Sequence, residues 1–348
     1  MIRNAMMPIT PRKIVDLVLI LLAASNIGLA YYLARAMTAE APAAATTVVL
    51  VEKGLGPASI ARLLQQNQLL KHPRAFRLAY SLYYSPRFLI AGEYSFEPPL
   101  TARKIMQQMV AGKVLLHPIT IPEGLTFQEM ARLLEAKGYS YQGSFLEACR
   151  QTELIADLDP KAGNLEGYLF PETYHFSRGV SAGEIVRAMV NLFRKNFGPE
   201  ELTRSGELQM TVREIVTLAS LIEKETSREE EKPLVAAVFH NRLRLGMKLD
   251  CDPTIIYALK MEGRFDGNLR LRDKSLPSPY NTYLYPGLPP GPICNPGLSS
   301  IRAALHPAPV DYLYFVSRND GSHVFNRSFQ EHQRAVLKYQ LKNGRRLR

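Results

Sequence analysis

The chain has 348 residues, of which 46% are hydrophobic and 22% are charged, and its formal net charge is +11 at pH 7. This composition excludes a disordered chain, and the length favours two or more folded units. A basic chain suits an anionic partner such as lipid headgroups, an acidic polymer or nucleic acid. Because the sequence has no glycine-rich phosphate loop, no zinc-finger spacing and no dense basic helix, nucleic acid is the least favoured partner.

The first predicted element is a membrane anchor over residues 14–35. The stretch Leu17 to Ala34, LVLILLAASNIGLAYYLA, contains no charged residue and just reaches the length of a membrane-spanning helix. Basic residues are concentrated before it, which places residues 1–13 in the cytoplasm and the rest outside. The alternative is a cleaved signal peptide, since Ala34-Arg35-Ala36 resembles a cleavage site. Residues 36–47 have the composition of a flexible linker.

An internal repeat follows the linker. Residues 49–64, VLVEKGLGPASIARLL, align without a gap with residues 119–134, ITIPEGLTFQEMARLL. Each copy predicts a short strand, a turn at a glycine and an amphipathic helix. In the second copy, Thr126 and Glu129 predict a capping box. We expect a small βα module over residues 48–160, and such a module suits binding better than catalysis.

A distinct unit is expected over residues 161–340, followed by a basic tail at 341–348. The sequence predicts helices at 181–197, 212–226, 233–245 and 329–340, and strands at 312–316 and 323–325. Between them, Ser278 to Pro292 is rich in Tyr, Asn, Thr, Pro and Gly. Such side chains suit a saccharide site, although a structural turn region has the same composition.

Carboxylates are the best candidates for catalysis. The sequence has no GxSxG elbow, and neither its three separated cysteines nor His306, His323 and His332 form a metal-binding pattern, so we expect no metal and no cofactor. In LASLIEKETSREEE, Glu223 and Glu225 are about 200° apart around a helix and cannot both face one narrow cleft. Periodicity does not choose between them, and two solvated charges at a helix end remain the ordinary alternative.

Several stretches together resemble the endolytic murein transglycosylase, or YceG-like, family over nearly the whole chain up to about Tyr339. They are LEGYLFPETY, LASLIEKET, VFHNRLRLGMKLDCDPTIIYAL, SPYNTYLYPGLPPGPICNPG, AALHPAPVDYLYFV and HVFNRSFQEH. The resemblance implies an α+β chain with a single transmembrane helix in the cell inner membrane, a LysM-like βα module and a mixed α/β catalytic domain in the periplasm. The two-glycine LysM-like pattern is diverged in this sequence.

The resemblance also implies an activity and a site. The activity is cleavage of the MurNAc–GlcNAc β-1,4 bond within nascent glycan strands, which leaves 1,6-anhydro-MurNAc ends and terminates elongation. The family's catalytic glutamate is placed on Glu223. As substrate-binding residues we expect Glu172, Asp252, Tyr280, Asn281, Thr282, Tyr283 and Asn295. The implied partners are peptidoglycan strands, the inner membrane and, as a further candidate, peptidoglycan synthases.

A lytic transglycosylase needs only one catalytic carboxyl, because the muramic C6 hydroxyl takes the place of the second. Two other classes stay open on the sequence. One is a non-catalytic peptidoglycan-binding scaffold for cell-wall synthases. The other is a muramidase-type hydrolase that uses Asp252 or Glu172 as its second carboxylate.

Overall fold

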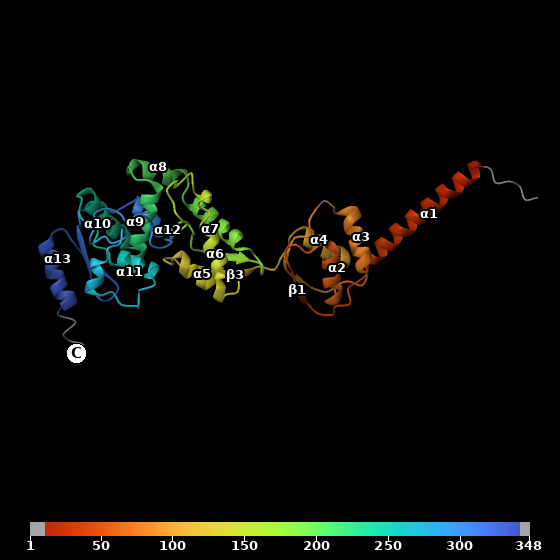
Figure 1. Cartoon of the computed structure of the whole chain (residues 1–348), viewed down its shortest axis with the longest axis horizontal. Coiled ribbons are helices and arrows are strands. Elements are labelled where there is room, and N and C mark those ends of the chain that lie inside the picture. The colour runs from red at the N-terminus through yellow and green to blue at the C-terminus, as the bar shows by residue number, and fades with distance from the viewer. Residues whose placement is uncertain (1–10, 86, 342–348) are drawn as a thin grey trace, which may run out of the picture. The chain divides into compact units, whose positions relative to one another are not determined.

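The computed structural model describes residues 11–85 and 87–341 and has a mixed α/β fold (Figure 1). The chain divides into two compact units. The N-terminal unit extends to His117 and includes residues 177–179, and the C-terminal unit contains residues 118–176 and those from 180 onward. The expected cytoplasmic segment 1–13 and basic tail 341–348 lie mostly outside the described residues.

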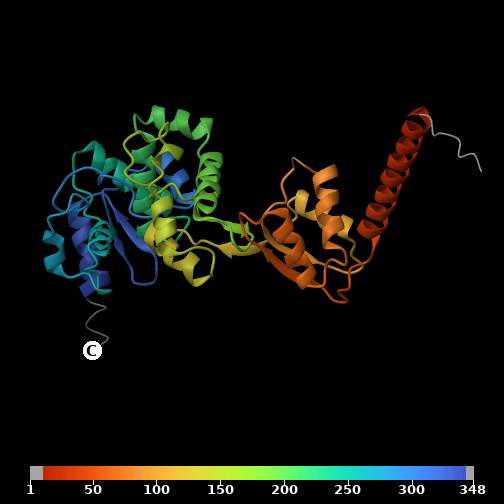
Figure 2. The ribbon, with the colours of Figure 1, turned by 45° about the vertical axis from the view of Figure 1, so that its right-hand side comes forward.

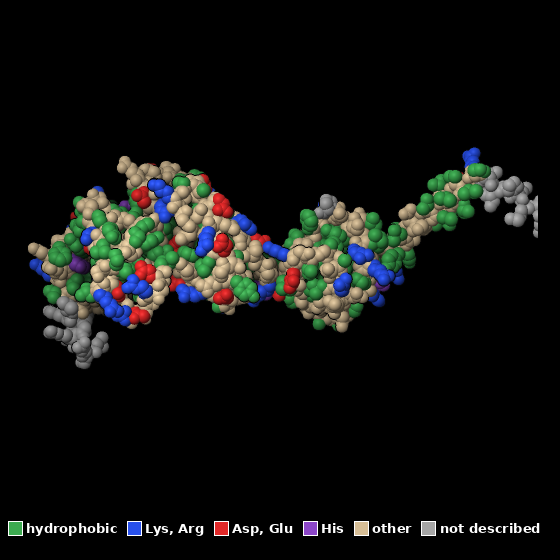
Figure 3. Space-filling model, in the orientation of Figure 1, with side chains coloured by type: hydrophobic (Ala, Val, Ile, Leu, Met, Phe, Trp, Pro, Cys, Tyr) green, Lys and Arg blue, Asp and Glu red, His purple; other side chains and the backbone are tan. Residues whose placement is uncertain are grey.

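Helix α1 (Pro11–Thr38) contains the predicted anchor. Its segment Ile14–Thr38 has a mean hydropathy of 2.0, and its most apolar stretch is not buried in the protein. Figure 3 shows hydrophobic side chains along the visible face of this helix. Only its C-terminal end is packed, where Leu33 and Ala36 meet Ala75 of helix α3 (Pro73–Tyr83). The helix is therefore long and apolar enough to cross a membrane once.

The remaining N-terminal unit is built around a two-stranded antiparallel sheet. Strand β1 (Thr47–Val51) pairs with β2 (Gly92–Phe96). Helices α2 (Pro57–Gln66) and α3 connect the strands, and α4 (Ala102–Val110) follows β2. Side chains alternate along β2, so that Tyr94 and Phe96 are buried and stack at 5.7 Å between ring centroids. The LysM-like assignment of this unit stays a prediction.

The two repeat copies belong to different units. The second copy forms strand β3 (His117–Thr120) and helix α5 (Phe127–Ala136), with the predicted capping box at its start. Gly54 and Gly124 occupy the equivalent turns at φ +87° and +73°, where glycine is favoured. The unit boundary thus lies at His117, before the boundary expected at 160/161, because α5 buries its apolar face in the core of the C-terminal unit.

The C-terminal unit consists mainly of helices (Figure 2). The helices after α5 are α6 (Gln142–Ala148), α7 (Ala182–Asn196), α8 (Pro199–Glu207), α9 (Val212–Glu225), α10 (Lys232–Arg244), α11 (Asp252–Met261), α12 (Leu298–Leu305) and α13 (Phe329–Val336). Short turns of other helix types are Thr152–Leu154, Leu271–Ser275 and Leu337–Leu341. The strands pair as β3 with β4 (Thr173–Phe176), and β5 (Tyr314–Ser317) antiparallel with β6 (His323–Asn326).

Helix α9 lies at the centre of this unit. Its start is fixed by a capping box between Thr211 and Glu214. Every residue from Ile215 to Ile222 is buried, because α8, α10, α11 and α12 all pack against the helix. Burial of each large aliphatic side chain contributes about 1.5–3 kcal/mol. The helix therefore has charged side chains only at its two ends, and Glu223 and Glu225 lie in its last turn.

The anchor can be tested by fractionation. We expect the full chain to stay in the membrane pellet after a carbonate wash, because α1 offers an unburied apolar surface that suits lipid. A variant that begins at residue 39 should appear in the supernatant. Release of the full chain by carbonate, or recovery of a shortened soluble form, would contradict an uncleaved anchor.

Candidate active site

The two glutamates at the end of α9 have separate surroundings. Glu223 contacts the starts of α10 and α12, whereas Glu225 contacts the segment before α11. This arrangement agrees with the angular separation expected from their spacing along a helix. The two carboxyls therefore have different chemical environments.

Glu223 is tied into the protein interior. Its side chain is 9% exposed, and its Oε2 accepts hydrogen bonds from the Gly297 backbone N–H (3.1 Å) and the Ser300 hydroxyl (2.6 Å). Both donors belong to the first turn of α12, whose free N–H groups favour a carboxylate. Glu223 thus links the end of α9 to the start of α12.

Lys232 completes this cross-link. Its side chain is 2% exposed, and its Nζ lies 3.7 Å from Glu223 Oε2. The same ammonium donates to Glu229 (2.8 Å) and to the Ser299 hydroxyl (2.6 Å). Glu123 lies 4.0 Å from Lys232. The pKa of the Glu123 carboxyl is raised, mainly by burial and also by the charge of Glu223. These contacts give Glu223 a structural place among α9, α10 and α12.

Glu225 lies in the wall of a cavity of about 490 Å³. The lining residues come from five elements and their connections: Glu225, Arg242, Leu249, Asp250, Asp252, Tyr283, Tyr314, Phe315, Phe329 and His332. The cavity combines carboxyl groups with several aromatic side chains. Such a mixture of apolar faces and polar groups suits a sugar ring.

Burial raises the pKa of the Glu225 carboxyl, and the charge of Asp252 adds to this effect. Two contacts lower the pKa of Glu225 instead. They are a hydrogen bond from the Cys251 thiol to Glu225 Oε1 (3.0 Å) and the charge of the nearby His323. The pKa of Cys251 is itself raised well above its usual value by burial, so the thiol keeps its proton and stays a donor. A buried carboxyl with a raised pKa is the expected form of a general acid.

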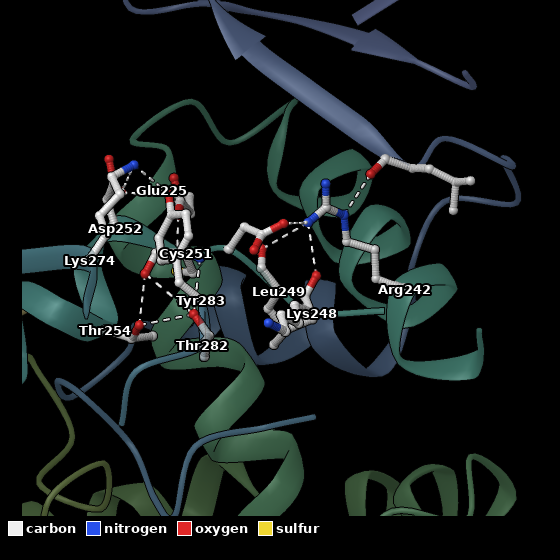
Figure 4. Close-up of polar contacts among 12 residues, drawn as sticks. Glu225, Arg242, Lys248, Leu249, Cys251, Asp252, Thr254, Lys274, Thr282 and Tyr283 are labelled. Carbon is white, nitrogen blue, oxygen red and sulfur yellow. Dashed lines mark hydrogen bonds and ion pairs between the residues drawn. The ribbon is translucent and has the colours of Figure 1, made fainter. Parts of the chain in front are cut away.

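Asp252 and Tyr283 form the polar wall beside Glu225 (Figure 4). The Tyr283 hydroxyl donates to Asp252 Oδ1 (2.6 Å), and Lys274 Nζ lies 3.0 Å from the same oxygen. The Lys274 ammonium also lies 4.3 Å from the centroid of the Tyr283 ring. Two of the sequence-predicted binding residues, Asp252 and Tyr283, are therefore brought together at the cavity.

The neighbouring loop residues support this wall from behind. Asn281 is fully buried, and its amide donates to the carbonyls of Lys274 (3.0 Å) and Leu276 (2.9 Å). The buried Thr282 hydroxyl accepts from the Cys251 backbone N–H (3.0 Å). These contacts favour a positioning role for Asn281 and Thr282 over direct contact with a glycan.

Tyr280, Asn295 and Glu172 do not line the cavity. The Tyr280 ring packs against Tyr257 at 4.9 Å between centroids. Asn295 is fully buried, and its side-chain oxygen accepts from the backbone N–H groups of residues 167 (2.8 Å) and 169 (2.9 Å). Glu172 is exposed and accepts from the next residue's backbone N–H (2.8 Å). Of the predicted binding residues, only Asp252 and Tyr283 therefore line the cavity together with Glu225.

Glu166 is a buried carboxyl that sequence reasoning missed. It accepts hydrogen bonds from the Phe127 backbone N–H (3.0 Å) and from Asn295 (2.8 Å). Burial raises its pKa to about 8. Its only sequence signal is its place in LEGYLFPETY, between apolar residues and a glycine. Glu166 joins the start of α5 to the segment that carries Asn295, so its role is structural.

Comparison with known proteins places this chain in a family. The family model described as "YceG-like family" matches residues 49–338, which is most of the chain. The chain belongs to the YceG-like family. A crystal structure of a protein described as YceG-like, from Listeria monocytogenes, shares 30% identity, with a TM-score of 0.56 over 84% of this chain and 99% of that one.

Two bacterial relatives bear a functional name. A Bacillus subtilis protein named endolytic murein transglycosylase is 33% identical over 314 residues, which cover 84% of this chain and 85% of the relative. A Streptococcus pneumoniae protein with the same name is 27% identical over 356 residues, which cover 92% of this chain and 63% of that relative.

The raised pKa of Glu166 predicts a pH-dependent stability. A free glutamate has a pKa of about 4.3, so the stabilisation from keeping Glu166 protonated is complete below that pH and is lost as pH rises through about 8. Chemical unfolding of a variant that begins at residue 39 should show this decline. Glu166→Gln, which cannot ionise, should reduce the decline between pH 5 and pH 9, and an unchanged slope would contradict the assignment.

Proposed function

We propose that this protein is an endolytic peptidoglycan lytic transglycosylase. It cleaves the MurNAc–GlcNAc β-1,4 bond within nascent glycan strands and leaves 1,6-anhydro-MurNAc ends. Membership of a family whose relatives bear this name supports the substrate class. The observation that carries the chemistry is a single buried carboxyl with a raised pKa, Glu225, in a cavity lined by aromatic and polar side chains.

The resemblance assigns proton transfer to Glu223, and we further propose Glu225 as the alternative that the cavity and the raised pKa favour. The resemblance favoured Glu223, but the contacts of that side chain connect it to α10 and α12, and it does not line the cavity that contains Glu225. Glu225 lines a cavity, and its pKa is raised by burial. A general acid must be protonated and must reach the bond that it cleaves.

In this mechanism Glu225 acts twice. Its carboxyl group first donates a proton to the glycosidic oxygen, and the bond from that oxygen to C1 of MurNAc breaks with the electron pair leaving on oxygen. The resulting carboxylate then accepts the proton of the C6 hydroxyl while O6 forms a bond to C1. The carboxyl is restored, no water is consumed, and the internal nucleophile gains from its proximity.

Asp252 is the remaining candidate for a second catalytic carboxylate, because it lines the same cavity as Glu225. It accepts the Tyr283 hydroxyl and lies 3.0 Å from the Lys274 ammonium, so its charge is already compensated. We propose that it favours the protonated form of Glu225 and steadies positive charge that develops at C1. A muramidase-type hydrolase that used Asp252 would give a reducing end in place of the anhydro end.

We propose the cellular location of the reaction from the predicted membrane anchor and from the family. A single pass of α1 through the inner membrane, with the N-terminus in the cytoplasm, would hold the catalytic unit in the periplasm beside newly made strands. Cleavage there would act as a terminase of elongation, and peptidoglycan synthases are candidate partners. The proposed LysM-like unit would contribute glycan affinity.

Paired variants test the choice of glutamate. Glu225→Gln keeps the side-chain size but cannot donate an acidic proton, so release of anhydro-muropeptides from uncrosslinked glycan should fall by about 10²- to 10⁴-fold. Glu223→Gln should mainly lower the unfolding temperature, because it weakens the contact with Lys232, and should keep much more of the activity. Mass spectrometry of the products follows both rates. Normal cleavage by Glu225→Gln would overturn the assignment.

The pH profile provides a second test. Because burial raises the Glu225 pKa, the acid form should persist above the pH at which free glutamate ionises, and the rate should fall as pH rises through the raised value. Cys251→Ala removes a donor that favours the carboxylate, so the falling limb should move to higher pH. Cys251→Ser keeps a donor and serves as the control. If the falling limb of the pH–rate profile stays at the same pH in Cys251→Ala, this role of the thiol is contradicted.

A further inference from the structure

Helix α3 of the N-terminal unit lies at the level at which α1 would leave a membrane. The uncharged stretch 17–34 of α1 is flanked by Asp16 and Arg35. Charged side chains stay with the headgroups, and a stretch of this length just crosses a hydrocarbon core of ~30 Å. When α1 crosses a membrane, its residues 30–34 therefore lie at the boundary between the acyl chains and the headgroups.

Both ends of α3 lie beside this short segment of α1 (Figure 1). The ring of His72, just before α3, lies 6.4 Å from the ring of Tyr32. At the other end of α3, Tyr83 lines the same hollow as Ala30 and Ala34 of α1. Because neither end moves away from the segment, α3 crosses α1 and runs along the surface of the proposed membrane.

The side of α3 that is turned away from the core of its unit is amphipathic. Phe76 and Ala79 are buried in that core. Arg74, Leu78 and Leu82 follow one another at intervals of four and form a stripe on another side of the helix. Leu78 is 37% exposed and Leu82 is 55% exposed. Leucine beside arginine on one exposed stripe is typical of a helix that lies in the membrane interface.

The charge around α3 is strongly positive. Residues 39–117 contain nine Lys or Arg residues against four Asp or Glu residues, and none of the acidic residues falls within 53–92. Within the part of the chain that the structure describes, no carboxylate forms an ion pair with Arg74 or Arg103. These guanidinium groups are therefore free to pair with lipid phosphates, and basic side chains close to an anionic leaflet are attracted to it.

A hollow of about 230 Å³ connects α3 and α4 to α1. It is lined by Ala30, Leu33, Ala34 and Met37 of α1, by Ala79, Tyr83 and Tyr84 of α3 and its end, and by Arg103 and Gln107 of α4. The wall from α1 is apolar, whereas α4 supplies a guanidinium and an amide. This combination suits a phospholipid, because its phosphate can pair with Arg103 while an acyl chain continues along α1.

We propose that the exposed stripe of α3, together with Arg103 at the hollow, docks the N-terminal unit on anionic phospholipid beside α1. This inference goes beyond glycan cleavage and rests only on the proposed passage of α1 through the membrane. Continuity with α1 identifies the occupant, since a helix held at this level faces headgroups and acyl chains. Lipid phosphates pair with Arg74 and Arg103, and Leu82 reaches the acyl chains.

An introduced tryptophan tests the docking, because the chain contains no Trp. The full chain with Leu82→Trp is placed in nanodiscs of phosphatidylcholine, alone or mixed with phosphatidylglycerol, and brominated acyl chains serve as contact quenchers. With both lipids present, we expect bromination to reduce the emission at least about twofold. Leu50→Trp is the matched control. Leu50 is 43% exposed in the same unit but lies beside Gly179, so its emission should not be quenched.

Charge variants of the Leu82→Trp chain test the role of the phosphate. Arg74→Gln with Arg103→Gln should reduce the quenching in mixed nanodiscs to that in phosphatidylcholine alone, because the attraction weakens with each charge removed. Lys113→Gln is the control, since Lys113 is exposed but follows the other end of α4, and it should leave the quenching unchanged.

Each contrary result overturns a stated part of the inference. If Leu82→Trp is quenched no more than Leu50→Trp, α3 does not lie on the membrane. If phosphatidylglycerol and the arginine variants leave the quenching of Leu82→Trp unchanged, anionic headgroups do not hold this face. A full chain that does not stay with the nanodiscs would overturn the inference together with the anchor. None of these measurements depends on glycan cleavage, so the proposed activity is tested separately.

Discussion

Burial of α9 on every side is the constraint on which the C-terminal unit depends. Four helices pack against it, and each residue from Ile215 to Ile222 is removed from solvent. Even its buried Ser220 is satisfied, since the hydroxyl donates to the Thr217 carbonyl and accepts from the Ile293 backbone. A helix held in this way cannot rotate or slide without losing the whole core. The positions of the two carboxyls in its last turn are therefore fixed by packing, before any ligand is present.

The same geometry gives the two carboxyls different surroundings. Glu223 meets the first turn of α12 and a buried lysine, so its oxygen is bonded within the protein. Glu225, on another side of the helix, meets a neutral thiol and a cavity, and burial raises its pKa. Two glutamates in one helical turn thus have different environments, and such differences are the usual origin of acid–base assignments in enzymes.

Sequence periodicity predicted much of the local structure but not the site. One capping box predicted the start of α5, helices were predicted at 181–197 and 212–226 where α7 and α9 lie, and the β5–β6 pairing was also confirmed. Angular spacing predicted that the glutamates diverge, yet their partners come from distant segments, such as Lys232 and Cys251. A sequence also cannot show whether an amide binds backbone or sugar. Asn281 and Asn295, which we expected at the glycan, are buried and bonded to the protein.

The central claim is that Glu225 is a protonated acid in a preformed cavity. Titration of its carboxyl carbon by NMR tests this most directly, with a ¹³C-glutamate-labelled variant that begins at residue 39 and with Glu225→Gln to assign the signal. We expect a midpoint above the ~4.3 of a free glutamate, and a higher midpoint still in Cys251→Ala. A midpoint at or below that of free glutamate would contradict it, because the carboxyl would then be ionised before it could donate a proton.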